Sequence, residues 1–291
     1  MSAPPRSRIQ TIAAKSPEFA PFLALVAIAL EEAGAPLWST LVSDGSLRTT
    51  ADPTPLAPLL DDAEIAVPES AARRLVAQLL EAASHKAAAR SPKLDPLALI
   101  EAAIHHDAIR VAAIADELGV DPAALGPIAQ LAAMPLLLAC SRALTPRIAP
   151  GFAEGYCPIC GGFPTIAEVR GLERRRRLRC GRCGGDVGFE ALACVFCGQR
   201  DHLRLTALVP ESGGEARKVE ACEDCHGYLK MLASLTAWPA EAVLLEDLGS
   251  VDLDLAAHKR GYTRGDEPGH RAGVRLLGAP ERKRRLWGIL S

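Results

Sequence analysis

Eight of the nine cysteines of this sequence form four C-x-x-C pairs between residues 157 and 225. The pairs are Cys157/Cys160, Cys180/Cys183, Cys194/Cys197 and Cys222/Cys225. Two intervening residues let both sulfurs of a pair point at one metal ion from a tight turn. Two such turns carried by one β-hairpin complete a tetrahedral thiolate site. The spacing therefore predicts two metal ions, each bound by four cysteines.

Glycine follows three of the four pairs, at Gly161, Gly184 and Gly198. Glycine permits the positive φ that keeps the backbone of such a turn close to the sulfurs, where its N–H groups can hydrogen-bond to thiolate. The fourth pair departs from this pattern, because His226 stands in the corresponding place.

Sequence order favours one site from the first two pairs and a second site from the last two. Each site then encloses one predicted hairpin, with strands over residues 165–170 and 175–179 in the first and over 204–209 and 217–220 in the second. An interleaved arrangement of the four pairs is the alternative, and it would break both hairpins.

Metal binding is favoured over disulfides for these cysteines. The N-terminus shows no basic and apolar leader, so we expect the protein in the reducing cytoplasm. Residues 151–231 also contain few large apolar side chains, and structural zinc contributes roughly 10–16 kcal/mol to small peptides. Four thiolates suit zinc as well as iron, and the C-x-x-C-G turn occurs both in rubredoxin and in zinc ribbons. The spacing leaves the choice between iron and zinc open.

A basic run lies between the first two pairs, with arginines at 174–177, 179 and 182. These side chains could offset the negative charge of a tetrathiolate site, dock a partner or form a solvated hairpin face, and the last interpretation is favoured. Nucleic-acid binding rests on this run alone, since aromatic residues for base stacking are few.

The remaining candidates for chemistry have ordinary structural explanations. Cys140 lies in an apolar stretch and is predicted to be a buried small hydrophobe. His105 and His106 fall near the end of a predicted helix, and His202 and His226 lie near sites that four cysteines already complete. Closed sites lack the open position of catalytic zinc, and no nucleophile elbow or phosphate-binding loop occurs, so we expect no enzyme.

The elements around the cysteines indicate an α+β protein. Helical spacing and capping signals predict an all-helical domain over residues 1–150, followed by two tandem rubredoxin-like or zinc-ribbon modules over 151–190 and 191–231. Residues 44–66 read as a long connection, a short helix is expected after Tyr228, and residues 232–291 read as a helical segment with a basic tail. The net charge of -2 and the short apolar runs at 22–30 and 131–140 argue against nucleic-acid binding and membrane insertion.

Several segments resemble the formate dehydrogenase accessory proteins of the FdhE family. The segments are Cys157–Gly161 with Pro164, Leu178–Cys180 with Cys183, Cys194–Gly198, Cys222–Lys230, Glu246–Leu248, Leu253–Asp254 and Gly261–Arg264. Val187 and Ala191 replace a tryptophan and an arginine that the family usually carries, which marks a divergent member.

The resemblance implies a cytoplasmic, non-enzymatic accessory protein that resembles a chaperone. It implies binding of the molybdenum- or tungsten-containing catalytic subunit of formate dehydrogenase, and rubredoxin-type sites that hold iron. The alternative function is a rubredoxin-like electron carrier or redox sensor. The sequence leaves the oligomeric state open.

Overall fold

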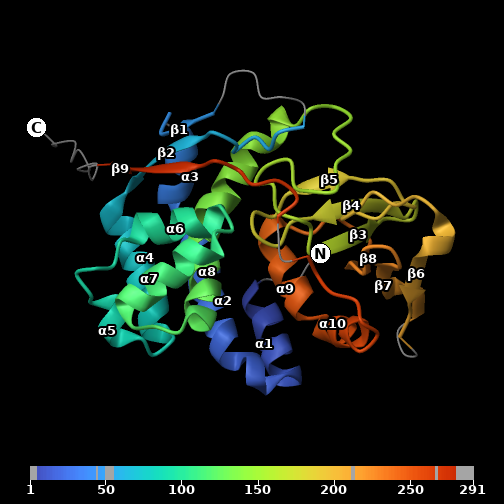
Figure 1. Ribbon diagram of the computed structural model, residues 1–291, viewed down its shortest axis with the longest axis horizontal. Coiled ribbons are helices and arrows are strands. Elements are labelled where there is room, and N and C mark those ends of the chain that lie inside the picture. Colours follow the sequence, from blue (N-terminus) through green and yellow to red (C-terminus); the bar gives the residue numbers. More distant parts are fainter. Residues whose placement is uncertain (1–4, 44, 50–55, 211–213, 266–267, 280–291) are drawn as a thin grey trace, which may run out of the picture.

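The computed structural model describes residues 5–43, 45–49, 56–210, 214–265 and 268–279. Helices dominate its first half, and they gather on one side of the molecule, while the cysteine-bearing strands lie on the other side (Figure 1). These helices are α1 (Pro5–Lys15), α2 (Ala20–Ala33), α3 (Pro36–Ser43), α4 (Glu69–Ala82), α5 (Lys86–Ala89), α6 (Pro96–Ile104), α7 (Ala108–Leu118) and α8 (Pro122–Leu144).

Aspartates cap the first turns of α6, α7 and α8. The carboxylates of Asp95, Asp107 and Asp121 each accept a hydrogen bond of 2.9 Å from a backbone N–H in the first turn of α6, α7 and α8. Such capping satisfies N–H groups that have no partner inside the helix. Helix α7 ends at Gly119, whose φ of 66° closes it in the left-handed conformation.

Helix α8 forms the centre of the helical half and contacts α2, α3, α4, α6 and α7. It is continuous, although Pro127 and Pro135 lie inside it. It is also long and apolar enough to cross a membrane by length and composition, contrary to the expectation from the separate apolar runs. However, 72% of its most apolar window is buried in the protein, as in the core helix of a soluble fold.

The cysteine-rich half is built on one six-stranded sheet of order β5-β4-β3-β8-β7-β6. The strands are β3 (Ile166–Arg170), β4 (Arg175–Arg179), β5 (Asp186–Gly188), β6 (Leu205–Leu208), β7 (Arg217–Cys222) and β8 (Tyr228–Ser234). The two predicted hairpins, β3–β4 and β6–β7, are both present and antiparallel. Strand β8 joins them, because it runs parallel to β3 and antiparallel to β7.

The prediction of a short helix after Tyr228 is wrong, since this segment is the central strand β8. Its residues alternate between the two faces of the sheet, and residues 228–232 are all buried. A strand that is buried on both faces has a continuous apolar pattern, which the sequence alone cannot distinguish from a buried helix.

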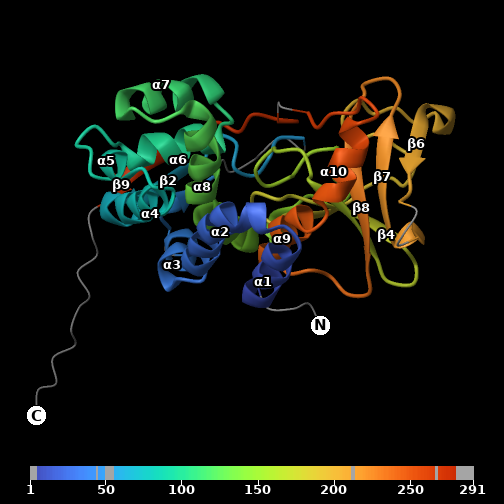
Figure 2. The ribbon, with the colours of Figure 1, turned by 90° about the horizontal axis from the view of Figure 1, so that it is seen from below.

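The C-terminal segment returns to the helical half. After α9 (Val243–Leu248) and α10 (Val251–His258), strand β9 (Arg275–Ala279) pairs in parallel with β2 (Glu64–Pro68), which also pairs with β1 (Leu47–Arg48). Figure 2 shows this segment crossing between the two halves. Residues 44–66 were interpreted as a connection, and the C-terminal segment as helical up to a basic tail. Both interpretations missed this three-stranded sheet, in which β2 and β9 lie about two hundred residues apart in the sequence. Residues 280–291 of that tail lie outside the described residues.

Three apolar clusters stabilise the part of the chain that the structure describes. The largest fills the helical half and extends to the first four cysteines. The other two lie on opposite faces of the six-stranded sheet. Leu253 and Ala257 of α10 pack on one face, against Ile166 and Tyr228, and Phe196 of the third cysteine turn packs on the other.

Candidate metal centres

The eight paired cysteines gather into two clusters with the adjacent pairing that the sequence favours. Within each cluster the four sulfurs lie within 4.8 Å of one another. The first cluster contains Cys157, Cys160, Cys180 and Cys183, and the second contains Cys194, Cys197, Cys222 and Cys225. The interleaved arrangement is therefore wrong.

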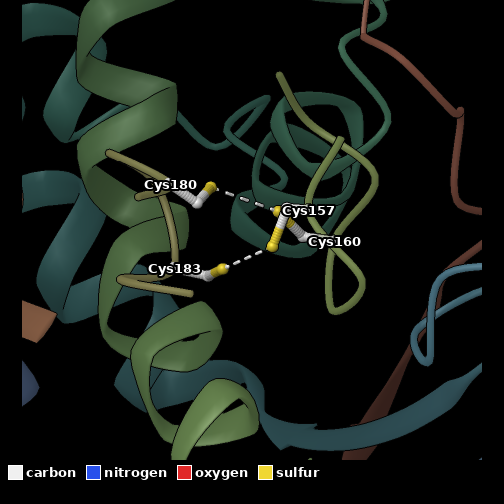
Figure 3. A group of neighbouring side chains, drawn as sticks. All are labelled: Cys157, Cys160, Cys180 and Cys183. Carbon is white, nitrogen blue, oxygen red and sulfur yellow. Dashed lines mark hydrogen bonds between the residues drawn. The ribbon is translucent and has the colours of Figure 1, made fainter. Parts of the chain in front are cut away.

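The sulfur separations suit a tetrahedral tetrathiolate site. In the first cluster Sγ of Cys157 lies 3.4 Å from Sγ of Cys183, and Sγ of Cys160 lies 3.6 Å from Sγ of Cys180 (Figure 3). The corresponding separations in the second cluster are both 3.7 Å. A tetrahedron with metal–sulfur bonds of roughly 2.3 Å has edges of about 3.8 Å. All eight cysteines are free thiols, so the donor set fits a soft or borderline metal ion.

Four similar backbone turns hold the sulfurs in place. In the first turn the N–H of Gly161 donates to the carbonyl of Cys157 at 2.9 Å, and the turns ending at Gly184 and Gly198 have the same bond at 2.9 and 3.0 Å. These three glycines have φ of 76°, 71° and 74°, which confirms why glycine is needed there.

His226 takes the same left-handed conformation in the fourth turn, with φ of 54°. Its carbonyl accepts a hydrogen bond of 2.9 Å from the N–H of Thr263, and its ring lies 6.1 Å from that of Tyr262. The segment after α10 therefore supports this turn. His226 belongs to neither sulfur cluster.

The first cluster is embedded in the protein. Its four cysteines are each at most 4% exposed, and they form part of the main apolar core. The backbone N–H groups of Leu59 and Leu60 donate to the carbonyls of Pro158 and Ile159 at 2.8 and 3.0 Å, which fixes the first turn to the helical half.

Arg182 fixes the second turn of this cluster to α6 and α8. Its guanidinium donates to Nε2 of His106 at 2.5 Å, to the carbonyl of Ala103 at 2.6 Å and to Oε1 of Gln130 at 3.1 Å. Burial and the neighbouring Arg182 lower the pKa of His106 to about 4, so the imidazole is neutral and can accept this bond. His105 bonds through Nε2 to the carbonyl of Val274. Neither histidine belongs to a sulfur cluster.

The second cluster lies partly at the surface. Cys194 and Cys222 are buried, whereas Cys197 and Cys225 are exposed. Burial raises the pKa of the Cys194 thiol to about 11. The exposed His202 is near this cluster in sequence but does not belong to it.

A buried charge cluster adjoins the fourth turn, and sequence analysis did not find it. Nζ of Lys230, which is fully buried, lies 2.7 Å from carboxylate oxygens of both Asp247 and Asp254. Arg264 contacts the same two carboxylates at 2.6 and 2.7 Å, and Tyr228 donates to Asp254 at 2.7 Å. Although Asp247 is largely removed from solvent, Arg264 and Lys230 hold its pKa below the usual value. The cluster ties β8 to both C-terminal helices.

The basic run is not a solvated face as a whole. Arg176 and Arg179 are buried, and they form ion pairs with Glu220 and with the fully buried Glu168. Glu168 also accepts bonds from Arg170 and Ser234 on neighbouring strands. The prediction of a solvated face was therefore wrong for Arg176 and Arg179, because carboxylates inside the fold neutralise their charges.

Cys140 is buried in α8 and belongs to neither cluster, as expected. Burial raises the pKa of its thiol to about 12, which leaves it protonated and unreactive at neutral pH.

Comparison with known proteins points to one family. Residues 192–268 match a family model described as the C-terminal domain of FdhE. Protein FdhE of Escherichia coli O127:H6 is 34% identical over 116 residues, and that of Escherichia fergusonii is 33% identical over 116 residues. The aligned region covers 39% of this chain but only 37% of these relatives.

The fold of the whole chain is also similar to a solved structure. The crystal structure of the FdhE protein from Pseudomonas aeruginosa aligns with a TM-score of 0.51 at 23% sequence identity. The alignment covers 92% of this chain and 94% of the other. This likeness extends the shared fold to the helical half, beyond the residues that match in sequence.

Proposed function

We propose that this chain is a member of the FdhE family and an accessory protein needed for active formate dehydrogenase. In this proposal it binds the molybdenum- or tungsten-containing catalytic subunit in the cytoplasm and is not itself an enzyme. The strongest support is the match over residues 192–268, which covers the second sulfur cluster together with the charge cluster that braces it.

The same proposal assigns all eight paired cysteines as ligands of two metal ions, either iron or zinc. The support is the separation of 3.4–3.7 Å between opposite sulfurs and the reduced state of the thiols. A bound dication would supply the positive charge that lets four thiolates lie together. Since the four cysteines complete each site, no ligand position is left for a substrate, which supports a structural role.

The test of the accessory role is genetic and biochemical. Deletion of the gene should abolish formate dehydrogenase activity, and the wild-type chain should restore it. The purified chain should also retain the catalytic subunit in a pull-down. Unchanged formate dehydrogenase activity in the deletion strain, together with failure to retain the subunit, would overturn the proposal.

The ligand assignment has its own test and a matched control within the chain. Cys180→Ser should retain one ion per chain instead of two, as measured by elemental analysis. Cys140→Ala removes the cysteine outside both clusters and should retain two ions. Two ions per chain in Cys180→Ser would contradict the assignment.

A second candidate function is electron transfer or redox sensing at the second cluster. It is favoured by the exposure of Cys197 and Cys225, because electron exchange with a partner requires a site near the surface. Chain purified without oxygen should then contain iron and show a reversible one-electron couple. A chain that contains only zinc excludes this function, since zinc has no redox chemistry.

A further inference from the structure

Strand β6 forms an open edge of the six-stranded sheet. It pairs with β7 on one side, and on its other side no strand of the described chain pairs with it. Ala207, in the middle of the strand, is exposed. Open edges of this kind can accept an additional strand from another chain.

The register shows which backbone groups face outward. Arg204 lies opposite Glu223, and the N–H of Glu223 donates to the carbonyl of Arg204 at 2.9 Å. Hydrogen-bonded pairs alternate along an antiparallel ladder, so Thr206 and Leu208 also face β7. The N–H and the carbonyl of Ala207 therefore point to the open edge, as does the carbonyl of Leu205. The N–H of Leu205 already donates to the carbonyl of His202.

A cavity of about 150 Å³ lies beside this edge. Its walls are mostly apolar, and its lining includes Leu192, Leu205, Ala207 and Leu229. The side chain of Leu192 is 62% exposed, so part of the apolar lining is in contact with solvent. An apolar space of this size can hold one small apolar group.

The lining of the cavity also includes two basic side chains, one acidic side chain and two cysteines of the second cluster, Cys194 and Cys222. Arg176 and Lys218 lie 2.8 and 3.8 Å from the same carboxylate, that of Glu220. Arg176 is only 8% exposed, and its Nε–H has no hydrogen-bond partner in the described chain. Buried donors are nearly always satisfied, so this arrangement favours a ligand that brings another acceptor.

We propose that the β6 edge and this cavity form a docking groove for an extended strand of a partner protein. The strand pairs with the backbone of Ala207 and places an apolar side chain in the cavity. A carboxylate two residues away approaches Arg176 and Lys218, since side chains i and i+2 of a strand lie on the same face. The identification of the partner as the formate dehydrogenase catalytic subunit rests on the proposed function. The apolar and acidic residues expected in the bound strand follow from the groove alone.

Ala207→Pro is the sharpest test, because it removes an outward N–H and leaves the bonds to β7 in place. The ion content of Ala207→Pro should equal that of the wild type, which controls for the fold of the second cluster. The probe is a library of capped peptides that alternate threonine with leucine, valine, glutamate, glutamine or lysine. The full-length, metal-loaded wild-type chain should enrich peptides with an apolar and an acidic residue at i and i+2. Ala207→Pro should weaken their binding by roughly tenfold or more.

A charge reversal provides an independent variant. Lys218→Glu should shift the enriched peptides from glutamate toward lysine, while the ion content stays at that of the wild type. Absence of any enrichment by the wild-type chain, or equal binding by wild type and Ala207→Pro, would overturn the groove.

Pull-down of the catalytic subunit distinguishes this proposal from the accessory role. If the wild type and Ala207→Pro both retain the subunit equally, the groove is not the docking surface and the accessory role stands. If the wild type does not retain the subunit but enriches the peptides in a manner sensitive to Ala207→Pro, the groove stands and the accessory role falls.

Discussion

The two sulfur clusters each consist of four cysteines on two similar turns, yet their surroundings differ. The first is part of the main apolar core, and backbone bonds from Leu59 and Leu60 together with Arg182 fix it to the helical half. The second has two exposed cysteines, and the neighbouring support comes from ion pairs of Lys230 and Arg264.

This difference shows that one local motif can serve two purposes in one chain. Metal at the first cluster would stabilise the junction between the helices and the sheet. Metal at the second cluster would shape a surface, next to the open edge of β6 and the cavity beside it. We therefore expect ligand loss at the first cluster to affect the whole fold, and ligand loss at the second to remain local.

The largest expected effect is the loss of a ligand of the first cluster. Cys180→Ser should lower the free energy of unfolding by about 4 kcal/mol or more, because it removes a metal site from the core. Cys197→Ser should lose one ion as well, but should cost only about 1–2 kcal/mol, since its cluster is half exposed. Urea denaturation combined with elemental analysis measures both. Equal destabilisation by the two variants would show that the clusters do not differ as described.

The second expected effect concerns the charges that brace the second cluster. Lys230→Met should lower the free energy of unfolding by about 3–5 kcal/mol, because it removes a fully buried charge and leaves the partly buried carboxylates of Asp247 and Asp254 with fewer partners. Lys259→Met, at an exposed position, is the control and should change it by less than about 0.5 kcal/mol. A Lys230→Met protein as stable as the wild type would mean that the ion pairs do not support this region.

The third effect is the order in which the ions leave. A chelator should remove the ion of the second cluster at least about ten times faster than that of the first, since local opening is easier at an exposed site. Acid should accelerate release from the second cluster. The Cys194 thiol of the metal-free fold keeps its proton up to a pKa of about 11, so metal binding at neutral pH displaces that proton, and a lower pH favours release. Stopped-flow absorption with a chromogenic chelator from pH 7 to pH 5 measures this. Release of both ions at one rate would contradict the comparison.

A fourth effect compares equivalent glycines of the two clusters. A Cβ at Gly161 would lie 2.1 Å from the carbonyl oxygen of His270, so Gly161→Ala should cost about 2–3 kcal/mol. A Cβ at Gly198 would meet no atom within 4 Å, and Gly198→Ala should cost only the left-handed strain of about 1 kcal/mol. Thermal denaturation of the two alanine variants compares them. Similar losses of stability in the two variants would mean that the carbonyl of His270 does not restrict the space beside Gly161.

The two cysteine clusters, the pairing within them and the two hairpins were predictable because the information is local. Two residues between cysteines, a following glycine and short alternating strands each specify their own geometry. The burial of Arg176 and Arg179 was not predictable, because it depends on Glu220 and Glu168, which other strands bring close. The pairing of β2 with β9 was not predictable either, since the residue pattern of a strand does not indicate which distant segment pairs with it. The division at residues 150, 190 and 231 stays a prediction.

The smallest expected effect concerns His226, the residue at the glycine-like position of the second cluster. His226→Gly should change the free energy of unfolding by less than about 1 kcal/mol, because relief of left-handed strain offsets the greater freedom of the unfolded chain. His226→Val should be destabilised by about 1–2 kcal/mol, since a β-branched residue fits poorly at a φ of 54°. Both results are expected if position 226 requires only a left-handed backbone conformation and not an imidazole side chain. Thermal denaturation and elemental analysis test it. Loss of an ion from His226→Gly would instead mean that the imidazole itself contributes to the site.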